Sequence, residues 1–249
     1  RVRAFMRELD EELWRLGVPA KTEHNEVAPA QYELASVFST SNIACDHNQI
    51  MMELMRKVAL RHGFACLLHE KPFAGINGSG KHNNWSIVTS GGKNMLDPGH
   101  EPEKNPVFLL TMCAVITAVD KYADLLRLSA ACPGNEERLG GNEAPPAVVS
   151  VFLGNRMTHL LEELAMGHEL EHESLGPLLT GVKSLPLFTL DDSDRNRTSP
   201  FAFTGNKFEF RMVGSSQSIG LANAVTNAIV ADVFHDFADK LEGAADVES

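Results

Sequence analysis

The stretch Asn77-Gly-Ser-Gly-Lys-His82 joins a glycine-rich loop to an alternating pattern of side chains that continues to Val88. Side chains alternate between the two faces of a strand, so His82, Asn84 and Ser86 would share one face. The other face would carry Asn83, Trp85 and Ile87. The stretch therefore predicts a loop that leads into a β-strand, with His82 near the start of that strand.

A similar alternating pattern precedes this stretch. His24-Asn25-Glu26 is followed, seven residues after Glu26, by Glu33 in an alternating run from Gln31 to Phe38. Carboxylate and imidazole groups suit Mg²⁺ or Mn²⁺, ions that neutralise phosphate oxygens and so indicate ATP chemistry. The candidate metal ligands are Glu26, Glu33, His82 and Glu209.

Two arginines add guanidinium groups that suit phosphate oxygens. These are Arg197 and Arg211, and Arg211 shares one face of a predicted strand with Glu209. Any one of the candidates could instead be a solvated glutamate, a hydrogen-bonded core histidine or a surface ion-pair partner. The hypothesis therefore depends on their combination.

The order of the predicted elements indicates an α+β fold in one domain. Helices are predicted over residues 2–16, 41–61, 105–130, 147–175 and 223–241, and strands over 31–38, 64–70, 81–88 and 207–212. Helices and strands at uneven spacing favour α+β over a parallel α/β arrangement. Pro-Gly and Gly-Gly pairs predict a mobile loop over residues 132–146.

Composition argues against several classes of function. Acidic residues outnumber basic ones by 33 to 22, and the net charge of −11 speaks against a nucleic-acid partner. The longest apolar run, Pro106 to Val119, is too short to cross a bilayer, so no membrane partner is expected. The cysteines lack the paired spacings of zinc or redox motifs, and no signal peptide opens the chain. We therefore expect reduced thiols and a cytoplasmic location.

Five segments occur in the order found in glutamine synthetases, so the chain resembles that family. They are His24-Asn-Glu-Val-Ala-Pro29, Asn77-Gly-Ser-Gly-Lys-His82, Arg138-Leu-Gly-Gly-Asn-Glu143-Ala-Pro, Asn196-Arg-Thr198 and Lys207-Phe-Glu-Phe-Arg211. The loops are most similar to those of the long type III bacterial form. The resemblance implies a largely antiparallel, curved sheet, a partial barrel, flanked by helices.

The resemblance also implies roles for individual residues. It assigns Glu26 and Glu33 to one divalent metal, on the glutamate side, and His82 and Glu209 to a second metal that bridges the ATP phosphates. Substrate glutamate would be bound by Asn77, Gly78 and Arg138. The catalytic residues would be Glu143, which closes over the intermediate and helps deprotonate ammonium, with Arg197 and Arg211. ATP would be bound by His24, Ser86, Arg197 and Lys207.

A member of this family would use ATP, L-glutamate and ammonium. The glutamate side chain takes the γ-phosphoryl group of ATP, and ammonia then displaces phosphate from the γ-glutamyl phosphate. The resemblance implies Mg²⁺ or Mn²⁺, two or more per site, and homo-oligomeric rings whose active sites lie between subunits. Metals and arginines stabilise charge on the transferred group, and a closed loop excludes water.

Three departures from the family pattern limit what this chain is expected to do. The family's other two metal-binding glutamates and its small N-terminal domain have no match in residues 1–249, and whether a C-terminal part is absent too is left open. No second arginine follows Arg197 in Ser199-Pro-Phe-Ala-Phe203, and the segment from about Val151 to Asp194 is specific to the longer type. We therefore interpret the chain as a single, incomplete catalytic domain that is inactive alone.

Four other interpretations remain open at this stage. Gly75 to Lys81 satisfies most of a P-loop pattern, but His82 replaces the required Ser or Thr and a strand follows. His168-Glu169-Leu170-Glu171-His172 satisfies the zinc-protease pattern, although a charged helix face explains it as well. Within the same fold, the enzyme could join glutamate to an amine larger than ammonia. A non-catalytic scaffold relative is the fourth, and the retained ligand-type residues argue against it.

Overall fold

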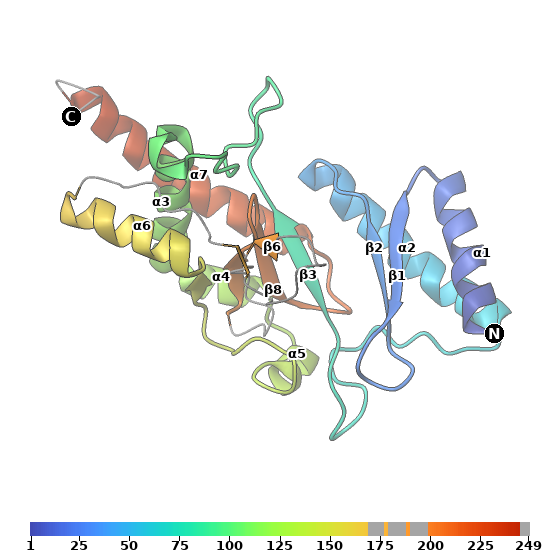
Figure 1. Cartoon of the computed structure of the whole chain (residues 1–249). Coiled ribbons are helices and arrows are strands. Elements are labelled where there is room, and N and C mark those ends of the chain that lie inside the picture. Colours follow the sequence, from blue (N-terminus) through green and yellow to red (C-terminus); the bar gives the residue numbers. More distant parts are fainter. Residues whose placement is uncertain (169–176, 179–187, 190–198, 245–249) are drawn as a thin grey trace. The chain divides into compact units, whose positions relative to one another are not determined.

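The computed structural model describes residues 1–168, 177–178, 188–189 and 199–244 (Figure 1). The chain divides into two compact units. The first contains Arg1–His82, Leu125–Ala147 and Met212–Asn227, and the second contains Asn83–Asp124, Val148–Arg211 and Ala228–Ser249. That both units belong to one domain stays a prediction.

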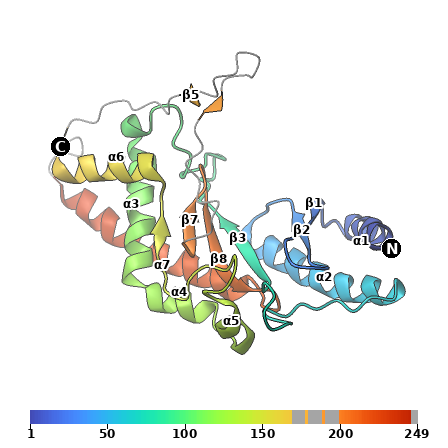
Figure 2. The ribbon, with the colours of Figure 1, turned by 60° about the horizontal axis from the view of Figure 1, so that its bottom comes forward.

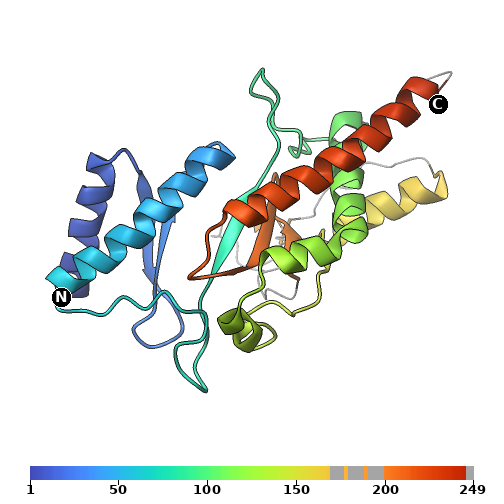
Figure 3. The same cartoon turned by 180° about the vertical axis from the view of Figure 1, so that it is seen from behind.

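In the first unit, two helices pack against an antiparallel hairpin. Helix α1 (Val2–Arg15) precedes strand β1 (Ala20–Asn25), which pairs with β2 (Tyr32–Ser36), and helix α2 (Ser41–Arg61) follows. Figure 3 shows α2 lying across one face of the hairpin. Apolar residues on one face of each helix bury against the start of β1. The cluster contains Leu9 and Leu13 of α1, Met51 and Val58 of α2, Val18 just before β1, and Ala20 at its start. This core holds the opposite end of the hairpin, with its polar side chains, in place.

A four-stranded sheet has the order β3-β8-β7-β4. Its strands are β3 (Gly80–Trp85), β8 (Phe208–Gly214), β7 (Phe201–Phe203) and β4 (Val151–Phe152). Strands β7 and β8 are antiparallel and lie side by side in Figure 2, whereas β4 pairs with β7 in parallel. The predicted strands over 81–88 and 207–212 are therefore confirmed as the cores of β3 and β8.

Aromatic side chains form the core of the second unit. The rings of Phe201 and Phe208 stack with their centroids 5.0 Å apart, and Phe203 lies 5.4 Å from Phe208. The ring of Phe108, on helix α3 (Pro106–Lys121), packs against that of Phe203 with the two centroids 6.0 Å apart. These rings are buried, and burial of such large apolar surfaces is the main stabilising term of a sheet-on-helix core.

The remaining elements are short or peripheral, apart from a long C-terminal helix. They are η1 (Pro102–Lys104), α4 (Ala123–Ser129), α5 (Pro133–Arg138), α6 (Asn155–Met166), the paired β5 (Pro177–Leu178) and β6 (Phe188–Thr189), and α7 (Gly220–Gly243). Lys121 of α3 donates to Asp232 of α7 at 2.8 Å, so an ion pair joins these two helices.

Three predictions from the sequence are wrong in detail. Residues 64–70 alternate in exposure like a strand but pair with no strand in the described part of the chain. The predicted helix over 105–130 is two helices, α3 and α4, bent by 76°. Their break falls at Tyr122, whose hydroxyl donates to Asp232 at 2.6 Å. The sequence has no Gly or Pro at this position that would have indicated the break.

The third error concerns residues 147–175. Only Asn155–Met166 of this range is a described helix, because Gly154 at φ 84° precedes it and Gly167 at φ 71° ends it. Residues 169–176 lie outside the described part. Helix α2 is capped by Thr40, which has an extended backbone and makes no capping hydrogen bond from its side chain.

The α+β class is confirmed. Among the described residues the strands form open sheets and no closed barrel. No single helix of the described chain has the length and apolar character of a membrane span, although the bent pair α3 and α4 together reaches that length and composition.

Candidate active site

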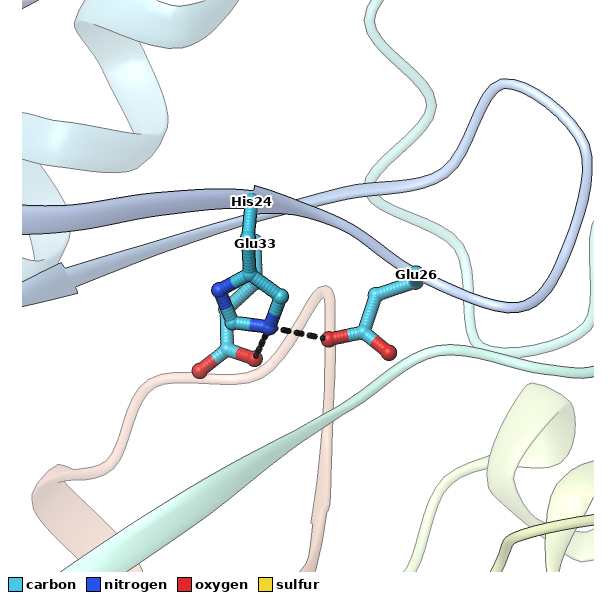
Figure 4. Close-up of side chains that lie close together, drawn as sticks. All are labelled: His24, Glu26 and Glu33. Carbon is cyan, nitrogen blue, oxygen red and sulfur yellow. Dashed lines mark ion pairs between the residues drawn. The ribbon is translucent and has the colours of Figure 1, made fainter.

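The hairpin β1–β2 brings His24, Glu26 and Glu33 together (Figure 4). His24 lies opposite Glu33 in the register of the two strands. Its Nε2 atom is 3.0 Å from Glu26 Oε1 and 3.1 Å from Glu33 Oε2. The turn between the strands is closed by Glu26 N–H, which donates to Gln31 O at 3.0 Å. Two predicted metal ligands and one predicted ATP-binding residue thus share one cluster.

The donor set of this cluster fits a divalent cation. One ligand atom from each side chain lies within 4.8 Å of the other two. Partial burial raises the pKa of Glu33, as do its contact with Glu26 and the charge of that residue, while the charges of His24 and His82 oppose the shift. A divalent cation would relieve the repulsion between the two carboxylates, so the site favours binding one. The residues fit the implied Mg²⁺ or Mn²⁺.

His24 is the residue whose place the sequence analysis did not foresee. The resemblance assigned it to ATP, whereas its imidazole lies between the two carboxylates. The signal was present in the hairpin, since pairing Asn25 with Tyr32 necessarily sets His24 opposite Glu33.

The other predicted metal ligands lie on β3 and β8. His82 belongs to the first unit, as the hairpin does, and its charge lowers the pKa of Glu33. Glu209 belongs to the second unit, where its Oε2 accepts a 2.7 Å hydrogen bond from Arg211 Nε. This contact confirms that Glu209 and Arg211 share a face of β8. That all four ligands meet at one site stays a prediction.

The glycine-rich loop contacts both the hairpin and the loop that follows α5. Gln31 Nε2 donates to Gly78 O at 2.9 Å, and Asn77 Nδ2 donates to Glu143 Oε2 at 2.8 Å. Gln31 did not figure among the candidates, and only its place in the turn between Glu26 and Glu33 could have indicated it. The structure thus brings Asn77, Gly78 and Glu143 together, as the shared site requires.

Arg138 is 5% exposed and lies against the same loop. Its Nη1 donates to Asn135 Oδ1 at 2.8 Å and to Met212 O at 3.5 Å. A Cβ atom at Gly78 would come within 2.8 Å of Arg138 Cγ, so only glycine fits there. The predicted loop 132–146 therefore contains an anchored helix, α5, that the sequence analysis missed, and its mobility stays a prediction.

The remaining candidates lie in the second unit or outside the described residues. Ser86, just after β3, and Lys207, just before β8, belong to the second unit, and their grouping with His24 stays a prediction. Lys207 O accepts from Thr204 N–H at 2.8 Å. Arg197 lies outside the described residues.

Two alternative motifs can also be placed. The residues after Gly80-Lys81 form strand β3, whereas a P-loop requires a helix there. Of the protease-like pattern, His168 is described, and its Nδ1 lies 2.9 Å from Glu163 Oε2, which is the arrangement of a surface histidine–carboxylate pair. Residues 169–172 of that pattern lie outside the described residues.

Comparison with known proteins agrees with the resemblance. The family model described as "Glutamine synthetase, catalytic domain" matches residues 1–132. A protein named type-3 glutamine synthetase from Dictyostelium discoideum is 52% identical over 232 residues, which is 93% of this chain and 32% of that protein. A glutamine synthetase from Butyrivibrio fibrisolvens is 59% identical over 209 residues, 84% of this chain and 30% of that protein.

Solved structures show the same fold. The structure titled "Apo GmaS without ligand" has a TM-score of 0.67 at 18% identity and covers 94% of this chain and 44% of its own. A Plasmodium falciparum glutamine synthetase has a TM-score of 0.63 at 15% identity, covering 94% of this chain and 38% of its own.

The chain spans about a third of the length of the curated relatives it matches. The family match nevertheless covers more than half of the 249 residues, and the type III likeness expected from the loops is confirmed by the relative of that name. The chain belongs to the glutamine synthetase catalytic-domain family.

Proposed function

We propose that the complete protein carrying this chain ligates ammonia to L-glutamate at the expense of ATP, through a γ-glutamyl phosphate intermediate. The observation that carries the proposal is the continuous set of contacts from the His24–Glu26–Glu33 cluster, through Gln31, to the Asn77–Gly78 loop and Glu143. These contacts link the candidate metal ligands of the hairpin to the loop that is expected to bind glutamate.

The metal side of the proposal depends on the carboxylates. Glu26 and Glu33 would hold one Mg²⁺ or Mn²⁺, with His24 beside them, and His82 and Glu209 would hold a second. When bound, such ions neutralise phosphate oxygens and stabilise the charge of phosphoryl transfer. Arg197 and Arg211 would add guanidinium groups to the same charge, and His24, Ser86 and Lys207 would contact ATP.

The substrate side depends on the loop and the residues against it. Asn77 and Gly78 would position the glutamate, and Arg138 would pair with its carboxylate. Glu143, which already contacts Asn77, would close over the intermediate, exclude water and accept a proton from ammonium.

The proposal extends to assembly and to the activity of residues 1–249 alone. The family resemblance supports homo-oligomeric rings with active sites between subunits, in the cytoplasm. Two family metal ligands have no match in residues 1–249, so we propose that these residues alone make no glutamine.

The test is a product assay on the complete protein with ATP, Mg²⁺ or Mn²⁺, L-glutamate and either ammonium or methylamine. We expect glutamine and phosphate in equal amounts with ammonium, and at least tenfold slower turnover with methylamine. Faster turnover with methylamine would replace ammonia by a larger amine in the same reaction. Absence of ATP cleavage with every amine would favour the scaffold interpretation and overturn the proposal.

A further inference from the structure

Glu70 is a buried carboxylate outside the set of residues assigned to the reaction. It is 2% exposed, which is rare for a charged residue without strong partners. Its Oε1 accepts hydrogen bonds from Ser216 N–H at 2.8 Å and from the Ser216 hydroxyl at 2.5 Å. Both donors lie in the turn that follows β8, so the charge of Glu70 holds that turn.

The same turn is held a second time, by Lys81. Its Nζ donates to the carbonyl oxygens of Gly214 at 3.2 Å, Ser215 at 2.6 Å and Gln217 at 2.6 Å. Three carbonyl acceptors use all three donors of an ammonium group. Glu70 therefore accepts from the turn 214–217 and Lys81 donates to it, and the electrostatic attraction between the two charges adds to this arrangement.

The turn packs closely against both side chains. A Cβ atom at Gly214 would overlap Glu70 Oε1, and one at Gly134, in α5, would come within 2.7 Å of Glu70 Oε2. The main chain of Glu70 adds a third contact, because its carbonyl accepts from Ser79 N–H at 2.7 Å. Glu70 thus contacts α5, the turn 214–217 and the glycine-rich loop.

Two of these segments, α5 and the glycine-rich loop, carry the residues expected to bind glutamate. Asn77 and Gly78 lie in the loop that Ser79 ties to Glu70, and Arg138 is on α5. Lys81 directly precedes His82 in β3. A change at Glu70 or Lys81 would therefore reach substrate contacts without touching substrate.

We propose that Glu70 and Lys81 form a positioning pair, which acts through the turn 214–217 to hold the loop 77–80 and Arg138 in their glutamate-binding arrangement. This inference rests on the proposed function. Neither residue is a catalytic residue, since neither contacts the reacting groups. The competing explanation is that the pair only stabilises the fold.

The test compares Glu70→Gln, Lys81→Met, Lys81→Arg and the double variant Glu70→Gln/Lys81→Met in the complete protein. Glu101→Gln and Lys104→Met are matched controls, because this exposed ion pair has the same charges at 2.5 Å and no role in the site. KM for glutamate, KM for ATP, kcat and the thermal midpoint are measured for each.

We expect Glu70→Gln and Lys81→Met each to raise the KM for glutamate about tenfold or more, because such a change corresponds to the loss of roughly one charged hydrogen bond. The KM for ATP should stay within about twofold of the wild-type value. Lys81→Arg should restore part of the loss, and the double variant should be less impaired than the product of the single effects. Controls should match the wild type. A fall in thermal midpoint with unchanged KM for glutamate would overturn the inference, as would equal changes in both KM values.

Glutamate binding measured without turnover separates this inference from the proposed function. If the wild type gains thermal stability with L-glutamate but forms no glutamine, the proposed reaction fails, whereas weaker stabilisation of the variants still supports the positioning pair. If the wild type gains none, both fail. Should Lys81→Met not fold, Glu70→Gln and Lys81→Arg decide the question alone.

Discussion

The side-chain amide of Asn77 donates a 2.8 Å hydrogen bond to the carboxylate of Glu143, 66 residues further along the chain. Glu143 also has a left-handed backbone conformation, at φ 56°, which is uncommon for a residue with a Cβ atom. Gly140 N–H donates to Pro145 O at 2.9 Å and closes the loop around it. Strained backbone conformations of this kind gather at functional sites, and the strain at Glu143 therefore supports a role for its carboxylate in the proposed chemistry.

Replacement of Glu143 by alanine should separate the two halves of the reaction. ATP binding should be unchanged, while glutamine formation should slow roughly 100-fold, because a proton acceptor at the site is lost. More phosphate than glutamine should appear, since water would reach the acyl phosphate. The ratio of glutamine to phosphate measures this. Glu137→Ala, an exposed position on α5, is the control, and an unchanged ratio in Glu143→Ala removes Glu143 from this role.

The hairpin cluster predicts where a metal binds. Glu33→Gln and Glu26→Gln each remove a charged ligand but keep the shape of the side chain, so Mn²⁺ affinity should fall roughly 10- to 100-fold. Calorimetric titration of the complete protein with Mn²⁺ measures the change. Glu23→Gln alters the neighbouring, exposed position of β1 and should have no effect. Equal affinities in all three variants would contradict a metal site in this hairpin.

Local patterns predicted α1, α2, β2 and the cores of β3 and β8, because each depends on alternation or helical spacing within a few residues. Strand β1 was not predicted, and the grouping of Glu26 with Glu33 was implied by the family resemblance. Other features depend on contacts between distant segments, which one sequence does not display. The bend at Tyr122 follows from its bond to Asp232, and the burial of Arg138 follows from the close approach of Gly78 and Gly80.

Residues 64–70 illustrate the same limit. Their alternation is real, but a strand also needs a partner, and the carbonyl of Glu70 is instead bonded to the N–H of Ser79. The sequence marked Glu70 only as the end of an apolar segment. Its partner Ser216 lies 146 residues away, so no local signal could have indicated the buried carboxylate.

The stability of the protein should depend on Glu70 in a pH-dependent way. Burial opposes its ionisation, but the two hydrogen bonds from Ser216 lower its pKa below the ordinary value of 4.5. The folded state therefore holds the proton less tightly than the unfolded state. The stabilisation is complete above the unfolded pKa and is lost as pH falls through the folded pKa.

Urea unfolding of the complete wild-type protein and of Glu70→Gln at pH 7 and at about pH 3.5 checks this prediction. The wild type should be more stable at pH 7, and the difference should shrink at the lower pH. His69, Lys81 and Cys132 interact electrostatically with Glu70 and are common to both proteins, so their titration largely cancels in the difference. A difference that stays constant with pH would show that the charge of Glu70 does not stabilise the fold.

The close approach of Gly80 to Arg138 gives the last prediction. A Cβ atom at Gly80 would overlap the Arg138 guanidinium group, although the backbone there is not left-handed and would itself accept alanine. Gly80→Ala should therefore displace Arg138 from Asn135 and raise the KM for glutamate about tenfold. The overlap should also lower the free energy of unfolding by roughly 1–3 kcal/mol. Gly91→Ala, where an added Cβ would meet only Thr89 Oγ1 at 3.9 Å, should behave like the wild type.

In the Arg138→Ala background the substitution at Gly80 should have almost no further effect, because the side chain it displaces is gone. An equal effect of Gly80→Ala in both backgrounds would mean that Gly80 matters for a reason other than Arg138.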